Sequence, residues 1–218
     1  YNSINRLCTE REVFDPEIWK RISQLTDTTM DVLETAQAIL KQEPWVPTPL
    51  LRANSLSWQL GADLWLKRED CTPIGSFKLR GALVTMTQRA ISIGRKGIYL
   101  ASAGNYGLAI ATAAQRYDVR VTVVVPEDAT PSKIEKIRLC GATIIHHGVD
   151  FDAAKNFART AATVDGGEFL EDGVVEEMAY GASTIASEIL DHSDSWDMIV
   201  IPIGNGSLIR GIGEVFKT

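Results

Sequence analysis

Residues 75–82 read GSFKLRGA and place one lysine, Lys78, among small and apolar neighbours where a predicted strand gives way to a predicted helix. The strand is expected at 63–68, and apolar side chains recur with helical spacing from Ser76 onward. A lysine in such surroundings loses hydration, so it needs a partner or a chemical role. Because helix N-termini carry positive partial charge, a neutral amine or an imine is favoured. The alternative is a lysine that extends into solvent.

The composition is that of an ordinary globular chain. The 218 residues are 45% hydrophobic and 23% charged, with a formal net charge of −6. Negative charge argues against binding nucleic acid or anionic membranes through bulk electrostatics. No apolar run approaches the roughly 20 residues of a membrane span, and residues 1–6 lack the apolar core of a secretory signal. We therefore expect a cytoplasmic protein with neither nucleic-acid nor membrane partners.

The cysteines and histidines give no sign of a disulfide framework or a metal site. Cys8, Cys71 and Cys140 are odd in number and widely spaced, and they are interpreted as free thiols. His146 and His147 are adjacent on a predicted strand, so their side chains face opposite ways. Since no group of Cys, His and acidic residues has ligand spacing, no metal is expected.

Short apolar strands alternate with helical patterns from residue 50 onward. This alternation predicts an α/β fold of twisted, mostly parallel sheets with helices on both faces. Residues 119–125 are nearly all apolar and β-branched, as expected of a strand covered on both sides. The predicted elements are helices 16–25 and 28–41, an extended segment 48–52, strand 63–68, helix 76–92, strand 97–101, helix 104–116, strand 119–125, helix 131–140, strand 142–146, helix 150–163, helix 174–190, strand 198–203 and a helix from 207.

Two glycine-rich turns follow predicted strands and open predicted helices. In ASAGNYG at 101–107, small residues let backbone N–H groups converge, and Ser102 and Asn105 add side-chain donors. The second turn, GNGSL at 204–208, lacks the third glycine of the dinucleotide fingerprint. Both predict an anion site, although tight turns also select glycine for backbone reasons alone. Since ligands collect beyond the carboxyl ends of parallel strands, we expect both turns and Lys78 to face one cleft.

Other segments are interpreted without a chemical role. Residues 67–70, KRED, are interpreted as a self-neutralised charge run at a solvated strand end. Residues 166–167 and 171–173 are interpreted as plain turns. Residues 181–185 lack the second glycine of a nucleophile elbow.

Taken in order, the lysine after Gly-Ser-Phe, the Ser-Ala-Gly-Asn turn and the late glycine-rich turn resemble the pyridoxal-phosphate enzymes of fold type II, the tryptophan synthase β-subunit family. Within it, the pattern is most similar to threonine and serine dehydratases, with serine racemase nearby. The similarity covers residues 47–216 and includes the segments 48–50, 67–69 and 181–188.

The resemblance implies two domains. A large domain would comprise residues 1–90, with an N-terminal helical extension, and residues 167–218, while residues 91–166 would form a small domain. The family's later strand, which places a small polar residue beside the ring nitrogen of the cofactor, has no counterpart here. The chain therefore resembles an N-terminal portion in which the large domain is incomplete.

The resemblance also implies residue roles toward pyridoxal 5′-phosphate and the substrate. Lys78 would form the imine with the cofactor, Phe77 would pack against its ring, and Asn105 would hydrogen-bond the ring hydroxyl. The substrate carboxylate would be bound by Ser102, Ala103, Gly104, Asn105 and Tyr106, and the cofactor phosphate by Gly204, Asn205, Gly206, Ser207 and Leu208.

Some of these positions depart from the family pattern. Tyr106 stands where the family usually has histidine, and Asn205 and Ser207 replace glycines of the phosphate loop. Ala103 stands where serine racemase has a serine that acts as a second acid–base group. That difference disfavours racemisation.

The predicted function is a pyridoxal-phosphate-dependent lyase. It would eliminate the β-hydroxyl of an amino acid such as threonine or serine and release a 2-oxo acid and ammonia, and relatives imply a homo-oligomer. One alternative is β-replacement in the same fold, although Leu79 and Arg80 follow the lysine in the dehydratase manner. Another is a non-catalytic or incomplete fragment that binds a phosphorylated ligand.

Overall fold

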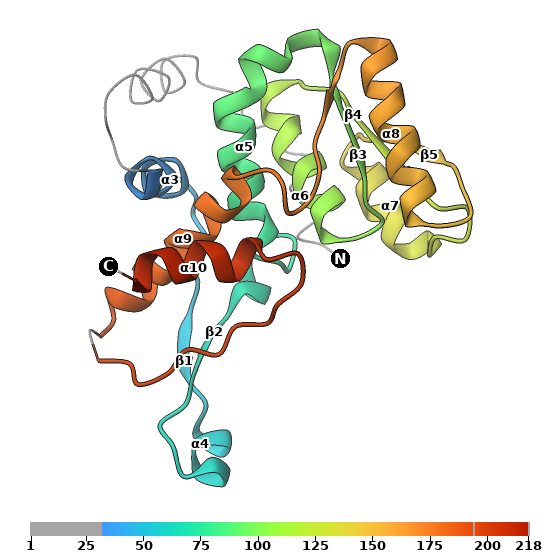
Figure 1. Cartoon of the computed structure of the whole chain (residues 1–218). Helices are drawn as coiled ribbons and strands as arrows, with labels where there is room; N and C mark the ends of the chain where they lie inside the picture. Colours follow the sequence, from blue (N-terminus) through green and yellow to red (C-terminus); the bar gives the residue numbers. More distant parts are fainter. Residues whose placement is uncertain (1–31, 194, 218) are drawn as a thin grey trace.

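The computed structural model describes residues 32–193 and 195–217 (Figure 1). The predicted helix 16–25, the start of the predicted helix 28–41, and Cys8 lie outside the described residues. The α-helices are α3 (Val32–Leu40), α4 (Asn54–Leu60), α5 (Lys78–Ile93), α6 (Asn105–Ala114), α7 (Pro131–Leu139), α8 (Phe151–Asp165), α9 (Glu177–Leu190) and α10 (Ser207–Phe216). The strands are β1 (Leu50–Arg52), β2 (Trp65–Lys67), β3 (Ile98–Ala101), β4 (Val121–Val125), β5 (Thr143–His146) and β6 (Glu168–Phe169).

The central sheet is parallel and has the strand order β5-β4-β3-β6. Successive residues of β4 face opposite sides of it, as a strand requires. Val123 packs in the large core that α5 and α6 share, whereas Val124 packs against Ala154 and Ala158 of α8. Helices therefore cover both faces of the sheet, and the predicted α/β class with parallel strands is confirmed.

A second, two-stranded sheet pairs β1 with β2 in antiparallel register, with Leu51 opposite Leu66. This ribbon and α4 project from the rest of the molecule (Figure 1). Trp58 on α4 is 86% exposed. Helix α4 was not predicted, because seven residues are too few to show a helical period.

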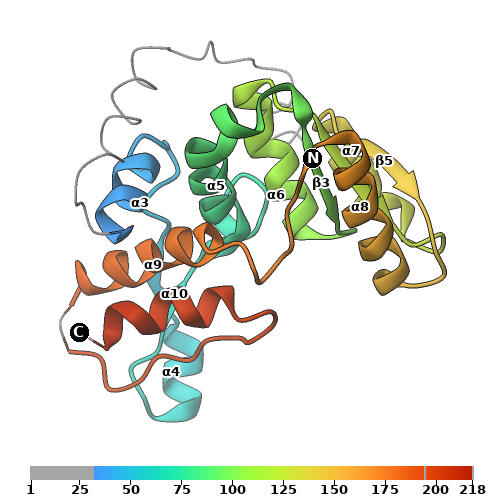
Figure 2. The ribbon, with the colours of Figure 1, turned by 45° about the horizontal axis from the view of Figure 1, so that its top comes forward.

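Helices α5, α9 and α10 pack through glycines. A Cβ atom on Gly181 of α9 would lie 2.3 Å from the backbone nitrogen of Gly81 on α5. A Cβ atom on Gly211 of α10 would lie 2.2 Å from the carbonyl oxygen of Ala179. Figures 1 and 2 show α9 and α10 side by side, with α5 adjoining α9. This close packing brings the N-terminus of α5 near the N-terminus of α10.

The predicted strand 198–203 is wrong. These residues form no strand and pair with no strand in the part of the chain that the structure describes. Met198 is 78% exposed and Val200 86% exposed. An apolar, β-branched run favours a strand, but a strand exists only where another backbone offers hydrogen bonds.

The division into a large and a small domain stays a prediction. Strand β6, just beyond the expected boundary at residue 166, pairs with β3 and so belongs to the central sheet. Across residues 32–193 and 195–217, no helix combines the length and the apolar character needed to cross a bilayer.

Candidate active site

The turn before α5 fixes where Lys78 lies. Gly75 has a φ of 71°, a left-handed conformation that favours glycine. The Thr72 hydroxyl accepts a hydrogen bond from the Ser76 N–H (2.8 Å) and donates to the Ser76 carbonyl oxygen (2.9 Å). The Ser76 hydroxyl in turn accepts from the Lys78 N–H (3.3 Å). Lys78 lies in the first turn of the helix, as predicted, although the helix begins at Lys78 and not at residue 76. Its side chain is only 11% exposed. The solvated-lysine interpretation is therefore wrong.

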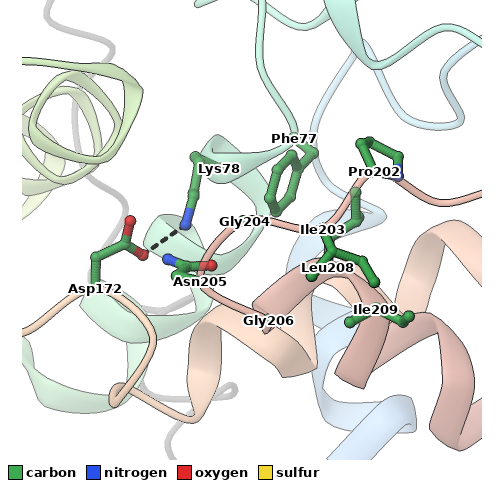
Figure 3. Close-up of a pocket in the computed structure, with 10 residues that line it drawn as sticks. All are labelled: Phe77, Lys78, Asp172, Pro202, Ile203, Gly204, Asn205, Gly206, Leu208 and Ile209. Carbon is green, nitrogen blue, oxygen red and sulfur yellow. Dashed lines mark hydrogen bonds and ion pairs between the residues drawn. The ribbon is translucent and has the colours of Figure 1, made fainter.

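The Lys78 amine has a charged partner and apolar walls (Figure 3). It donates a hydrogen bond to Asp172 Oδ1 at 2.5 Å and lies 3.4 Å from the Ser207 hydroxyl. Its nitrogen is 5.4 Å from the ring centroid of Phe77 and 5.6 Å from that of Tyr106. The amine is thus positioned by one carboxylate between two aromatic rings.

Lys78 lines a cavity of about 360 Å³, a volume typical of a small-molecule site. Gly206, with a φ of 92°, leads into α10, whose first N–H groups favour an anion. The Asn205 side-chain oxygen accepts from both the N–H (3.2 Å) and the hydroxyl (3.0 Å) of Ser207. The lining residues are Phe77, Lys78, Asp172, Pro202, Ile203, Gly204, Asn205, Gly206, Leu208 and Ile209 (Figure 3).

The turn after β3 lines a second cavity of about 460 Å³. Its lining residues are Ala101, Ser102, Ala103, Gly104, Pro126, Asp128, Ala129, Thr130, Lys133, Phe151 and Asp172. The Ser102 hydroxyl oxygen accepts from the N–H groups of Gly104 (3.2 Å) and Gly107 (3.1 Å), which leaves its proton available for donation. A Cβ atom on Gly107 would lie 2.8 Å from the Ser102 carbonyl oxygen, so this turn requires glycine there. Asp172 lines both cavities.

Asn105 and Tyr106, the two residues after Gly104 in this turn, line neither cavity. Asn105 is exposed at the start of α6. The Tyr106 side chain is 3% exposed, and its hydroxyl is buried without a hydrogen-bond partner among the described residues. Burial, and then the negative charge of Asp172, raise the pKa of Tyr106. Its hydroxyl therefore stays protonated.

Arg80 lies in the first turn of α5, two residues after Lys78, and fixes this turn through its side-chain contacts. Its side chain is fully buried, and its guanidinium donates to Glu69 (2.9 Å) and to Glu188 (2.6 Å). It also donates to the hydroxyls of Thr48 (3.1 Å) and Thr184 (3.0 Å). Three segments, around Thr48, around Glu69 and in α9, therefore meet at the guanidinium of Arg80.

The interpretation of residues 67–70 as a solvated charge run is half wrong. Arg68 and Asp70 do pair at the surface. Lys67, however, pairs with Glu188 at 2.5 Å, and each of these side chains is only 10% exposed. Burial alone would raise the pKa of Glu188, but hydrogen bonds and charge from Arg80, then Lys67, lower it.

Sequence reasoning missed Asp172, because residues 171–173 were interpreted as a plain turn. The residue follows β6, which is two residues long and shows no strand pattern. Since β6 runs parallel to β3, the segments after both strands emerge at the same edge of the sheet. An acidic residue after a recognised parallel strand would have been the signal.

Metal binding and disulfide formation find little support in the described part of the chain. Residues 32–193 and 195–217 hold no cluster of three His, Cys, Asp or Glu side chains placed to bind a metal ion. Cys71 and Cys140 form no disulfide with any residue that the structure describes.

Comparison with known proteins identifies the class that this fold and this lysine site define. A family described as pyridoxal-phosphate dependent enzyme matches residues 42–218. The chain therefore belongs to the family of pyridoxal-phosphate-dependent enzymes, and the predicted resemblance is confirmed.

Individual relatives narrow the likeness. The chain is 34% identical over 172 residues to a threonine dehydratase of Nicotiana attenuata. The aligned region covers 79% of this chain and 29% of that protein. The processed form of threonine deaminase isoform 2 from Solanum lycopersicum matches with a TM-score of 0.77 and 31% identity, over 87% of this chain and 53% of that one. Maize serine racemase matches with a TM-score of 0.77 and 25% identity, over 85% and 57%. The chain thus spans less than a third of the first relative's length and just over half of each solved chain.

Proposed function

We propose that this chain carries the lysine site of a lyase that dehydrates and deaminates a β-hydroxy amino acid such as threonine or serine. In that reaction the β-hydroxyl leaves as water and a second water replaces the amino group, which yields a 2-oxo acid and ammonia. The observation that carries the proposal is the Lys78 side chain, which lines a cavity between the N-termini of α5 and α10. Family membership and the dehydratase relatives support it.

The residues around this cavity fit pyridoxal 5′-phosphate. Gly204 and Gly206 have no heavy atom within 4 Å of a Cβ position, so the space beside this turn has room for a phosphate. Ser207 adds a hydroxyl beside them. Phe77 offers an apolar face for a pyridine ring. When bound, the cofactor supplies an electron sink for negative charge on the substrate α-carbon.

The remaining chemistry belongs to residues of this chain. The Lys78 amine would hold the cofactor and, once freed, accept the α-proton of the substrate. Ser102 would donate its hydroxyl proton to the substrate carboxylate, and the backbone N–H groups of Ala103, Asn105 and Tyr106 would add to it. The buried ring of Tyr106 would help exclude water from the amine.

Chemical trapping of the cofactor tests this proposal. The chain is incubated with pyridoxal 5′-phosphate and reduced with borohydride, and its peptides are analysed by mass spectrometry. We expect the pyridoxyl group on Lys78. Lys78→Ala should lose the visible absorbance of the imine, whereas Lys133→Ala, at the second cavity, should keep it. Trapping on other lysines, with none on Lys78, would contradict the proposal.

The reaction itself is tested by product release. Threonine and serine should each release a 2-oxo acid whose amount is unchanged by added thiols or amines. Product in which the added nucleophile has replaced the β-hydroxyl would instead indicate β-replacement. A chain that binds plain phosphate as tightly as the cofactor would indicate the non-catalytic alternative.

We also propose a cytoplasmic homo-oligomer that takes a small amino acid as its partner molecule and binds neither nucleic acid nor membranes. The net charge of −6 supports the last two points. Analytical ultracentrifugation of the purified chain tests the assembly, and fractionation of source cells tests the location.

A further inference from the structure

We propose that Asp172 is a positioning residue, whose carboxylate accepts a hydrogen bond from the Lys78 nitrogen both in the free amine and in the imine with the cofactor. The proposal deepens the proposed function and rests on it for the second of these two states. It starts from a 2.5 Å ion pair between two residues 94 positions apart, in a cavity where the lysine side chain is 11% exposed and the aspartate side chain 28%.

Among the described residues, the Asp172 carboxylate has Lys78 as its one side-chain hydrogen-bond partner. Its neighbour Glu171 pairs with Arg159 (2.8 Å) and Lys155 (3.5 Å) of α8, whereas the Asp172 carboxylate bonds to Lys78. A carboxylate in a partly buried pocket needs a cation or a donor beside it. When Lys78 is converted to a protonated imine, its nitrogen still carries a proton and a positive charge. That nitrogen is the group in reach that meets this need.

The other groups that face the pair are neutral or more distant. Phe77 on α5 and Tyr106 on α6 offer rings, and burial keeps the Tyr106 hydroxyl protonated. At the start of α10, the Ser207 hydroxyl lies 3.4 Å from the amine, and the helix terminus carries positive partial charge. That terminus disfavours a second positive charge, so the negative charge of Asp172 offsets it.

Asp128 and Lys133 line the second cavity together with Asp172. They are of opposite sign, so their long-range effects on the Lys78 nitrogen oppose each other. Asp172 is therefore the group expected to set the charge state of the imine. Its loss should make the imine give up its proton at lower pH.

The first test needs no cofactor. Trace labelling with acetic anhydride at mildly alkaline pH compares the reaction rate of Lys78 with that of the exposed Lys136 in the same sample. In Asp172→Asn, the relative rate of Lys78 should rise at least about threefold, because the amine no longer donates its hydrogen bond to a carboxylate that holds it in place. Glu171→Gln, one residue away, should leave the rate unchanged. An unchanged rate in Asp172→Asn would overturn the proposal.

Lys67 reports folding in the same experiment, since it pairs with Glu188 away from the cavity. It should stay protected in every variant. If Lys67 loses protection in Asp172→Asn, the decision passes to Asp172→Glu, which keeps the charge. That variant must protect Lys78 to within about twofold of the wild-type protein, or the proposal fails.

The second test is spectroscopic. With pyridoxal 5′-phosphate bound, the visible absorbance of the protonated imine is followed across pH. Its midpoint should fall by about one pH unit in Asp172→Asn and stay in place in Glu171→Gln. Equal midpoints in wild type and Asp172→Asn would refute the role toward the imine. If no variant forms an imine, the proposed function fails, while the labelling result still decides whether Asp172 holds the amine.

Discussion

At the scale of single residues, the site depends on an arginine that never touches the cavity. Arg80 lies two positions after Lys78, and its guanidinium is satisfied by two carboxylates and two hydroxyls. A charge buried so completely is tolerated only with partners in good geometry. The network therefore ties the turn that carries Lys78 to the segment just after β2, to α9 and to the segment before β1.

Removing this guanidinium should strongly destabilise the fold. Arg80→Met leaves Glu69 and Glu188 without their main partner, and breaking a buried pair in this way costs about 3–5 kcal/mol. Urea denaturation followed by circular dichroism measures the change. The control is Arg138→Met, whose pair with Glu135 is more than half exposed and should contribute less than about 1 kcal/mol. Equal losses in the two variants would contradict the assigned role of the network.

The same network predicts how stability depends on pH. Because folding lowers the pKa of Glu188, its contribution is fully present above its unfolded pKa of about 4.3 and is lost as pH falls through the lower folded value. Urea midpoints measured from neutral to acidic pH should fall more steeply in wild type than in Glu188→Gln. Parallel curves would show that folding leaves the pKa of Glu188 unchanged, contrary to this prediction.

Residue patterns in the sequence predicted part of this site. Lys78, Phe77 and residues 204–208 carry local signals, namely a lysine at a strand-to-helix junction and glycines before a helix. The structure brings all of these except Ser207 into the lining of one cavity. The partner of Lys78 comes from a turn 94 positions away. Neither that pairing nor the contacts of Arg80 leave a periodic trace, because side-chain contacts between distant segments depend on the assembled fold.

At the scale of elements, the glycines of three helices set the distance between them. Helix propensity alone would favour alanine over glycine by up to about 1 kcal/mol. At Gly181 the new methyl group would meet the backbone of Gly81 at 2.3–2.5 Å, so α5 and α9 would have to move apart. Steric contact should therefore outweigh propensity at this position.

A matched pair of substitutions tests this ranking. Gly181→Ala should lower the free energy of unfolding by at least about 2 kcal/mol, as overpacking in a rigid core does. Gly213→Ala, in α10 with no atom within 4 Å of the new Cβ, should raise it by up to about 1 kcal/mol. Thermal denaturation of both variants gives the two signs, and stabilisation of both would refute the packing argument.

Elements whose own sequence has a clear hydrophobic pattern were predicted within a few residues of their observed limits. The helix predicted at 76–92 is α5, Lys78–Ile93, and the strand predicted at 119–125 contains β4. The failures are elements defined by a partner rather than by their own sequence. Strand β6 exists because β3 lies beside it and pairs with it. Residues 198–203 form no strand because no described strand pairs with them.

At the scale of the whole molecule, residues 198–203 leave apolar surface open to water. Met198, Val200 and Ile203 are each at least 70% exposed. Exposed apolar side chains close together in sequence favour association with other chains. The 218-residue chain should therefore self-associate as its concentration rises.

Charge substitutions in this segment should reduce that association. The double variant Met198→Lys and Val200→Lys is expected to lower the average mass seen by light scattering at high concentration. Val164→Lys, at an isolated position on α8 that is 78% exposed, should have no such effect. A double variant that associates like wild type would assign the contact to another surface.

The arginine network also has a consequence for synthesis on the ribosome. Glu188 leaves the exit tunnel 108 residues after Arg80, so the nascent chain carries the guanidinium long before its second carboxylate is made. The turn that carries Lys78 can therefore gain the full set of Arg80 contacts only after α9 has been translated. Lys78 itself is among the earlier parts of the described chain to be made.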